Sequence, residues 1–387
     1  MIVKEVRTKK ERREFFKFPL KLYKGNPYAV PQLISDEDDE FNPEVNDAYS
    51  YAESKMFLCY DDSGKIAGRI AAIHNKAYNA KHNVKQLRFT RYDVIDDFAV
   101  TEALFEPVKA WAKELGMDEI VGPIGFSDLD KQGMLVEGFD RDDMYLTIYN
   151  YPYYVSHMEK LGMKKAADWV EYRIAVPTEP DERLYRIADM VKERSGFEYY
   201  EIKSFKSVEK VIHRALKEIM NEVFAHLYGV VEITDRQIKR EADMLKQVWV
   251  NDFVTAVKNR EGEVIGYGFM APSVSKAMRK MNGKITLGGV FQLMHDLSHP
   301  EVVDLYSIGV RKEYQNSGVN AMIMARSLKS LINHKVKFLE TGPELESNVQ
   351  IQAQWKKYDK EQHRRRRCWS MKLGEAHADN APESEKE

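Results

Sequence analysis

Gly64-Lys65-Ile66-Ala67-Gly68 and Gly262-Glu263-Val264-Ile265-Gly266 are two copies of one pattern, and each follows an apolar run and a polar turn. The interval between them equals the interval between Asn150 and Asn348, which each open an aromatic-rich helical pattern. Gly122-Pro123 and Gly342-Pro343 each close a short apolar run between these landmarks. Landmarks that recur in the same order at so long a period indicate two copies of one fold rather than a solenoid.

The hydrophobic periodicity predicts the same succession of elements in both copies. In the first copy the expected segments are a basic helix at 9–24, strands at 56–60, 65–74 and 87–95, a helix at 101–115 capped by Thr101, a strand at 118–121, a helix from Asn150 to 161 and a strand at 170–176. In the second copy they are helices at 181–193, 207–228 and 234–247, a hairpin around Gly262, a Met-rich helix within 273–296, a strand at 302–310, a helix at 317–333, a strand at 336–341, a helix at 347–360 and a strand at 364–373. We expect an α/β fold in which each copy is a mixed, mostly antiparallel sheet flanked by helices.

The strongest linker signal is Pro177-Thr178-Glu179-Pro180. We therefore expect one domain over residues 1–176 and a second over residues 177–373. Residues 374–387 are polar and acidic, and this composition is typical of a disordered tail.

The composition of the 387 residues, 43% hydrophobic and 31% charged, is that of an ordinary globular protein. A net charge of -2 argues against a nucleic-acid-binding surface along the whole chain. Cys59 and Cys368 fall in strands of different copies, which predicts free thiols and a reducing compartment. Without an apolar leader or a long apolar stretch, we expect a cytoplasmic protein, a monomer or homodimer, with no integral membrane segment.

No metal-binding motif such as Cys-x-x-Cys or His-Glu-x-x-His occurs, and His74, His157 and His363 have no partner at ligand spacing. We expect no metal site. Gly-x-x-x-x-Gly-Lys-Ser/Thr and Gly-x-Ser-x-Gly are also missing, which leaves a nucleotide hydrolase or an α/β-hydrolase without support.

The second copy has a strand that runs through a turn into a helix, Leu305-Tyr306-Ser307-Ile308-Gly309-Val310 followed by Arg311-Lys312-Glu313-Tyr314-Gln315-Asn316-Ser317-Gly318-Val319-Asn320-Ala321. The start of a helix presents unpaired backbone N–H groups and partial positive charge, which suit a pyrophosphate. Gly318 would let the backbone approach such a group closely. The alternative is a tight turn that binds no ligand.

This junction resembles that of the GNAT acyl-CoA N-acyltransferases, which carry Arg/Gln-x-x-Gly-x-Gly/Ala there. Gln315 and Gly318 match, and Asn320 replaces the last small residue. The resemblance implies two tandem GNAT-like domains, with an acetyl-CoA or longer acyl-CoA co-substrate in the second. Its cofactor-binding residues would be Ser307, Ile308, Gly309, Val310, Gln315, Asn316, Ser317, Gly318, Val319, Asn320, Ala321 and Asn348.

The resemblance also implies a tyrosine that protonates the departing thiolate, but Trp355 and Met158 occupy that position in the two copies. Tyr358 is the candidate acid and Tyr306 the second choice, with Glu346 as the candidate base. At the first junction, Tyr92-Asp93-Val94-Ile95-Asp96-Asp97-Phe98 is acidic. We therefore expect that the first copy does not bind CoA in the usual way.

The long loop from Gly122 to Asp140 resembles a loop of bacterial double-GNAT proteins related to bacterial ceramide synthases, which join a fatty acyl group to a sphingoid amine. It would be either an acceptor-binding lid over a cleft between the domains or a solvated surface loop. A cluster of tyrosines would either line an acceptor groove or pack half-buried at a domain junction: Tyr145, Tyr149, Tyr151, Tyr153 and Tyr154. Arg364-Arg365-Arg366-Arg367 alternates along a strand, and we expect a solvated face.

The expected function is transfer of an acyl group from a CoA thioester to a small-molecule or lipid-like amine. One alternative is a Fem-like transferase that takes aminoacyl-tRNA, although the neutral charge disfavours it. The other is a non-catalytic CoA-binding or ligand-binding double-GNAT protein.

Overall fold

The computed structural model describes residues 1–374, except the side chains of residues 208, 210–212 and 214–216. Of the predicted acidic tail, residues 375–387 lie outside the described part. The first half contains β1 (Ile2–Glu5), α1 (Lys9–Leu22), α2 (Ile34–Glu40), η1 (Asp47–Ser50), β2 (Ala52–Tyr60), β3 (Ile66–Asn75), α3 (Lys76–His82), β4 (Gln86–Val94), α4 (Phe98–Glu114), β5 (Glu119–Gly122), β6 (Met134–Glu137), α5 (Tyr153–Lys160) and β7 (Lys164–Ala175).

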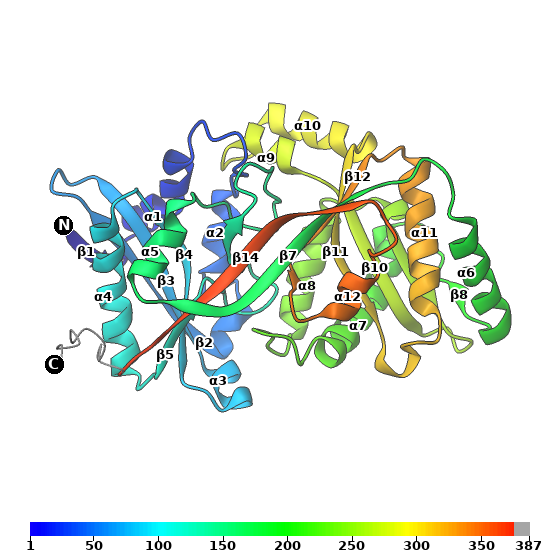
Figure 1. The fold of residues 1–387 in the computed structure, drawn as a ribbon, viewed down its shortest axis with the longest axis horizontal. Coiled ribbons are helices and arrows are strands. Elements are labelled where there is room, and N and C mark those ends of the chain that lie inside the picture. The colour runs from blue at the N-terminus through cyan, green and yellow to red at the C-terminus, as the bar shows by residue number, and fades with distance from the viewer. Residues whose placement is uncertain (375–387) are drawn as a thin grey trace, which may run out of the picture.

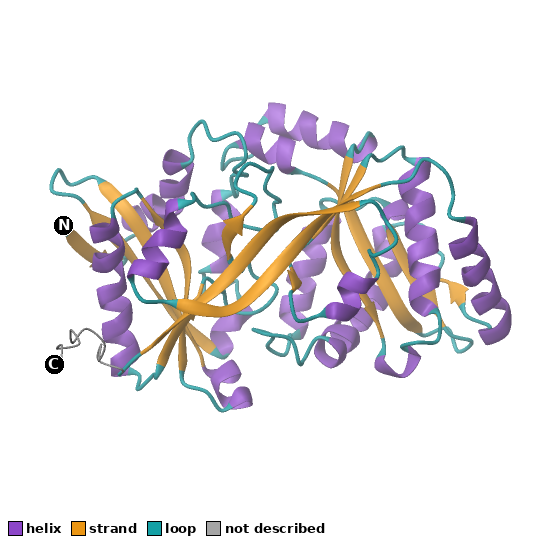
Figure 2. Cartoon of the chain, in the orientation of Figure 1, coloured by secondary structure: helices purple, strands orange, loops and turns teal. Residues whose placement is uncertain are grey.

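The second half repeats this succession with additional helices. It contains α6 (Glu182–Ser195), β8 (Glu198–Tyr199), α7 (Phe205–Val223), α8 (Asp235–Lys246), η2 (Asn251–Phe253), β9 (Val254–Lys258), β10 (Val264–Pro272), α9 (Ser275–Met281), α10 (Leu287–Ser298), β11 (Val302–Val310), η3 (Lys312–Tyr314), α11 (Val319–Asn333), β12 (Phe338–Thr341), β13 (Glu344–Leu345), α12 (Val349–Ala353) and β14 (Lys360–Lys372). Helices flank the strands of both halves, which confirms the expected α/β class (Figure 2).

One sheet runs through the whole molecule in the order β1-β2-β3-β4-β5-β14-β7-β12-β11-β10-β9-β8. The long antiparallel pair of β7 and β14 crosses from one half to the other (Figure 1). The last part of β14 pairs with β5, from Trp369 opposite Gly122. The last part of β7 pairs with β12, from Ala175 opposite Phe338. If the halves are divided at the expected boundary between residues 176 and 177, each half thus completes its sheet with a strand from the other.

The repeated glycine pattern has the same structural role in both halves. Gly64 and Gly262 form hairpin turns with φ of 77° and 82°, a conformation that favours glycine. Gly68 and Gly266 lie where a helix packs on the sheet. A Cβ on Gly68 would lie 2.9 Å from Leu104 of α4, and one on Gly266 would lie 2.6 Å from Val319 of α11. The first glycine therefore makes the turn, and the last allows close helix packing.

Several expected boundaries were wrong. Helix α4 begins at Phe98 and is capped by Asp97, whereas Thr101 is buried and its hydroxyl lies 2.8 Å from His157 Nδ1. The expected helix at 347–360 is only α12, because the chain turns after Ala353 and enters β14 at Lys360. The expected Met-rich helix is the pair α9 and α10.

The prediction of a solvated arginine face was also wrong for Arg364 and Arg366, whereas Arg365 and Arg367 on the other face are partly exposed. Arg364 and Arg366 are buried on β14, and Glu171 of β7 accepts a 2.5 Å hydrogen bond from each. Arg364 also pairs with Glu340, and Arg366 with Asp143. The two arginines lie where the halves cross, so their burial follows from the exchange of strands.

Candidate functional site

Strands β11 and β12 diverge within the second half. They pair in parallel only from Val302 opposite Phe338 to Leu305 opposite Thr341. From Tyr306 onward, β11 pairs with β10 alone, and a register shift leaves Tyr306 as an additional residue. Such a bulge bends the strand and interrupts its ladder. The edge from Tyr306 to Val310 is therefore paired with no second described strand and offers backbone donors and acceptors to an extended ligand. Of these groups, the Val310 carbonyl accepts a 3.4 Å hydrogen bond from Gln315 Nε2.

Helix α11 begins beside this open edge without a side-chain cap. Gly318 at its N-cap has φ of 91°, and Asn316 before it has φ of 64°. The first N–H groups of a helix have no partner within the helix, and its dipole favours an anion there. Residues 315–317 are exposed. The junction is therefore open to solvent and fits a diphosphate.

Gly318 also has a role in packing. A Cβ at this position would lie 2.3 Å from Cγ2 of Val191 in α6. The residue must therefore be glycine both for its backbone conformation and for the contact with α6. The glycine alone does not distinguish a ligand site from a tight turn, whereas the missing cap and the open strand edge do point to a ligand.

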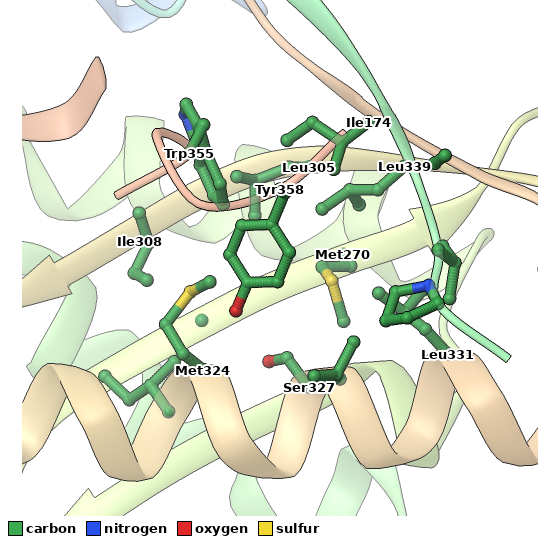
Figure 3. Close-up of a pocket in the computed structure, with 16 residues that line it drawn as sticks. Ile174, Met270, Leu305, Ile308, Met324, Ser327, Leu331, Leu339, Trp355 and Tyr358 are labelled. Carbon is green, nitrogen blue, oxygen red and sulfur yellow. The ribbon is translucent and has the colours of Figure 1, made fainter. Parts of the chain in front are cut away.

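A narrow apolar pocket lies between α11 and the diverging strands (Figure 3). The labelled side chains that surround it are Ile174, Met270, Leu305, Ile308, Met324, Ser327, Leu331, Leu339, Trp355 and Tyr358. The hydroxyl of Tyr358 points into the pocket and has no hydrogen-bond partner among the described residues. Burial raises the pKa of Tyr358 to about 12, so this hydroxyl keeps its proton at neutral pH.

A wider cleft of about 340 Å³ lies on the other side of β11. Residues 128–132 of the first half form one wall, and α7, α8 and β11 of the second half form the others. Leu305 and Ile308 border both this cleft and the narrow pocket. The open strand therefore separates two cavities, and the loop from Gly122 to Asp140 lies against the wider one.

The wider cleft is lined by carboxylates. Burial raises the pKa of Asp128 to about 6 and the pKa of Glu241 to about 7. Neither forms an ion pair with another described residue. In the adjoining cavity, burial and the neighbouring Asp130 carboxylate raise the pKa of Glu40 well above its usual range. Acidic groups in a partly enclosed cleft favour a cationic ligand.

Glu344 of β13 also borders the cleft. Its Oε1 accepts a 2.8 Å hydrogen bond from Nε1 of Trp355, while its buried Oε2 has no partner among the described residues. Burial raises the pKa of Glu344 to about 7. A carboxylate that titrates near neutral pH is suited to general-base catalysis.

Glu346 has a different environment and lines neither cavity, although its neighbour Leu345 lines the wider cleft. Its two oxygens lie 2.5 Å from Lys165 Nζ and 2.5 Å from Arg365 Nη1. These side-chain hydrogen bonds, from Lys165 first and then Arg365, lower the pKa of Glu346. A carboxylate held between two cations is a weaker proton acceptor than Glu344.

Tyr306 and Asn348 lie at the wider cleft, whereas the predicted residues from Gln315 to Ala321 line neither cavity. Tyr306 borders the wider cleft and packs its ring on Phe269 at 5.4 Å between centroids. Burial raises the pKa of Tyr306 far above its usual value. Asn348 also borders this cleft, and its side chain caps α12 by accepting a hydrogen bond from the Ile351 N–H.

Within residues 1–374, no cluster of three or more His, Cys, Asp or Glu side chains is placed to hold a metal ion. In the same part of the chain, no helix combines the length and apolarity needed to cross a membrane.

The chain is similar to known proteins both in sequence and in fold. No family model matches the chain. It is 24% identical over 381 residues to Protein YghO of Escherichia coli K12, covering 96% of this chain and 95% of that protein. It is 26% identical over 325 residues to a bacterial ceramide synthase of Caulobacter vibrioides, covering 82% of each. Among solved structures, it matches a tandem GNAT protein from the clavulanic acid biosynthesis pathway with a TM-score of 0.53 and 11% identity, over 97% of this chain and 99% of that one. The chain has a tandem GNAT fold.

In the first GNAT copy, the strand edge and the helix start that correspond to those of the second copy are occupied by side chains of the chain itself. Its strands β4 and β5 also diverge after Arg88 opposite Val121. There, however, Tyr153 donates a 2.6 Å hydrogen bond to the Val94 carbonyl, and the Val94 N–H donates a 2.9 Å bond to Tyr154. Asp97 caps the following helix. The chain's own side chains thus satisfy both the strand edge and the helix start.

Three carboxylates of the wider cleft were not predicted from the sequence: Asp128, Glu241 and Glu344. The long Gly-rich loop was a signal for Asp128, because such loops often carry function. Glu344 follows Gly342-Pro343 directly, at the point where the strands part. No sequence pattern around Glu241 indicates a site, because α8 reaches the first half only through tertiary packing.

Proposed function

We propose that the protein is an acyl-CoA-dependent N-acyltransferase whose second GNAT copy binds the thioester and whose wider cleft binds the amine. One observation carries this proposal. The open strand β11 has a narrow apolar pocket and an uncapped helix start on one side, and a carboxylate-lined cleft on the other. In an acyl transfer the amine must reach the acyl carbon from a different side than the CoA that carries it. The two cavities on either side of β11 provide these two approaches.

The donor side offers main-chain groups suited to CoA. The N–H groups from Gly318 to Ala321 would hold the diphosphate, with Gln315, Asn316 and Ser317 around it. The edge from Ser307 to Val310 would pair with the pantetheine amides, as a strand pairs with an added peptide. Asn348 would stabilise this region through its cap of α12.

On the acceptor side, Glu344 is the proposed base in place of Glu346. The bound thioester supplies an electrophilic acyl carbon, which only an unprotonated amine attacks. Glu344 would accept the amine proton directly or through one water. Tyr358 would act as the proton donor from the narrow pocket, with Tyr306 as the alternative on the cleft side.

The cleft suits an amine that also carries an apolar part. Its carboxylates Asp128 and Glu241 favour an ammonium group, whereas Leu129, Leu146 and Phe224 offer apolar walls. The similarity to the Caulobacter protein named as a ceramide synthase supports a lipid-like acceptor and a long acyl chain. We propose that the first copy shapes this cleft and binds no CoA, since its own side chains fill the equivalent positions.

Thermal unfolding in the presence of acetyl-CoA, a long-chain acyl-CoA, free CoA and tRNA tests the donor class. A ligand that binds only the native state raises the Tm as its concentration exceeds the Kd. We expect CoA compounds to raise the Tm and tRNA to leave it unchanged. A rise with tRNA alone would instead indicate a donor of the aminoacyl-tRNA type.

A further inference from the structure

Helix α10 carries apolar side chains both toward the protein and toward its surroundings. On its inner side, Val290 and Leu293 pack against a cluster that includes Val274 and Met278. On its outer side, Leu287 is 80% exposed, Phe291 70% and Met294 60%. A helix that is apolar all round is normally buried. The outer side of α10 has no such cover in the described structure.

The exposed residues form one stripe rather than scattered positions. Leu287, Phe291 and Met294 are four and then three residues apart, so they lie on the same helix face. Ile285, just before the helix, is 72% exposed and extends the stripe. A contiguous apolar surface of this kind marks a binding surface, whereas single exposed apolar residues need no explanation.

The segment that leads into the stripe is positively charged, and the one carboxylate of α10, Asp296, is buried and accepts a hydrogen bond from Gln292. From Ser273 to His295 the chain contains no Asp or Glu, but it contains Lys276, Arg279, Lys280 and Lys284. Lys276 pairs with Glu301, and Arg279 pairs with Asp142. Lys280 and Lys284 form no ion pair with any described residue, and both lie beside the start of α10. Lys280 Nζ donates a 2.5 Å hydrogen bond to Oε1 of the neutral Gln292 in α10, which leaves its charge uncompensated. The stripe is therefore bordered by two cations that no described carboxylate neutralises.

Helix α10 is also a wall of the cleft region. Leu293 lines the cavity that adjoins the wider cleft, together with Val274 and Met278. Figure 1 shows α10 on the outside of the molecule, above the region where the two halves meet. The same helix thus faces the cleft with one side and the surroundings with the other.

We propose that the outer face of α10 docks on an anionic lipid bilayer. An amphipathic helix whose Phe and Leu side chains enter the boundary of the acyl chains, with lysines at the headgroups, binds membranes in this way. The charge pattern favours a bilayer over a second copy of this chain. A symmetric contact through α10 would bring Lys280 and Lys284 of two molecules together, which like-charge repulsion opposes.

Docking would hold the cleft at the membrane surface, where an amphiphilic amine is most concentrated. This inference goes beyond the proposed chemistry and does not depend on it. Vesicle binding is measured without CoA or acceptor, so its failure would leave the acyltransferase proposal standing.

Co-sedimentation of the full chain with vesicles tests the docking. We expect binding to vesicles of phosphatidylcholine and phosphatidylglycerol at a ratio of about 3:1, weaker binding at high salt and little binding to pure phosphatidylcholine. The double variant Phe291→Ser/Met294→Ser should reduce the partition coefficient roughly tenfold or more, because two apolar side chains leave the bilayer.

Ile2→Ser is the matched control, since Ile2 is 61% exposed on β1 at the far edge of the sheet, and it should bind like the unchanged protein. Lys280→Glu/Lys284→Glu should weaken binding to the anionic vesicles and not change the far-UV circular dichroism. The proposal is overturned if no vesicle binds the protein, or if the Phe291→Ser/Met294→Ser variant binds equally well. A dimer in lipid-free solution that this variant dissociates would also overturn it, because the face would then be a self-contact.

Discussion

Glu344 and Glu346 are two positions apart, yet the fold raises the pKa of Glu344 and lowers the pKa of Glu346. Glu344 borders the cleft, with burial raising its pKa to about 7. Glu346 is half-exposed between Lys165 and Arg365, which lower its pKa. A base that accepts a proton from an amine works best when its pKa lies near the working pH. The environment therefore assigns this role to Glu344.

A base with a pKa of about 7 must be ionised to act, so kcat at saturating acceptor should rise with pH and level off above about 7. Glu344→Gln should lower kcat by roughly 10²- to 10⁴-fold, the usual range for a lost general base. Glu346→Gln is the matched control and should retain most of the activity. Equal losses in the two variants would show that Glu344 has no special role.

Trp355 gives a second test of the same assignment. Its Nε1 donates the hydrogen bond that lowers the pKa of Glu344. In Trp355→Phe the bond is lost and the ionised form is less stable, so the midpoint of the pH–rate profile should move to higher pH. A loss of activity with an unchanged midpoint would indicate only a packing defect.

At the scale of the elements, the crossing of β7 and β14 depends on buried charge. Glu171 on β7 bonds to both Arg364 and Arg366 on β14, and all three side chains are buried. Arg364 and then Arg366 lower the pKa of Glu171 to about 2 despite its burial. The stabilisation from this carboxylate is therefore complete above about pH 4.5 and is lost as the pH falls through about 2.

Glu171→Gln should lower the free energy of unfolding by about 3–5 kcal/mol, because two buried guanidinium groups lose the carboxylate that they share and keep only one carboxylate partner each, Glu340 and Asp143. Glu137→Gln is the matched control. It removes an exposed ion pair with Arg365 and should cost at most about 1 kcal/mol. Urea unfolding at neutral pH measures both, and a Glu171→Gln protein as stable as the control would contradict the account.

The same elements show which features can be predicted from the sequence and which cannot. The loop from Gln315 to Gly318 and the glycines of the two hairpins were predictable, since local backbone geometry requires those residues. The burial of Arg364 and Arg366 was not, because it arises only when β14 enters the other half. Glu344 is a similar case: its β13 pairs with β7 of the first half, opposite Val170. Local patterns cannot encode a partner that lies in the other half of the chain.

At the scale of the whole molecule, the exchange of strands makes the two halves interdependent. Strand β5 and much of β7 are paired by β14, which is the last strand of the chain. The first half alone would therefore expose unpaired edges and an open core. The carboxylate-lined cleft also exists only with both halves present.

We therefore expect one cooperative unfolding transition for the full chain in scanning calorimetry. Residues 1–176 expressed alone should be unfolded or aggregated, with no cooperative transition of their own. Two separate transitions, or a stable fragment, would show that the halves fold independently.

The proposed donor site depends on one contact, in which the start of α11 holds the diphosphate of CoA. Isothermal titration calorimetry with CoA, on the unchanged protein, Ser317→Ala and Ser317→Glu, tests it most directly. Ser317 is exposed at this junction, so neither substitution disturbs packing as a change at Gly318 would. We predict that the alanine variant binds CoA like the unchanged protein and that the glutamate variant binds roughly tenfold more weakly or worse, since its carboxylate repels the phosphates. Equal affinity of all three proteins, or no CoA binding by any, would contradict the account.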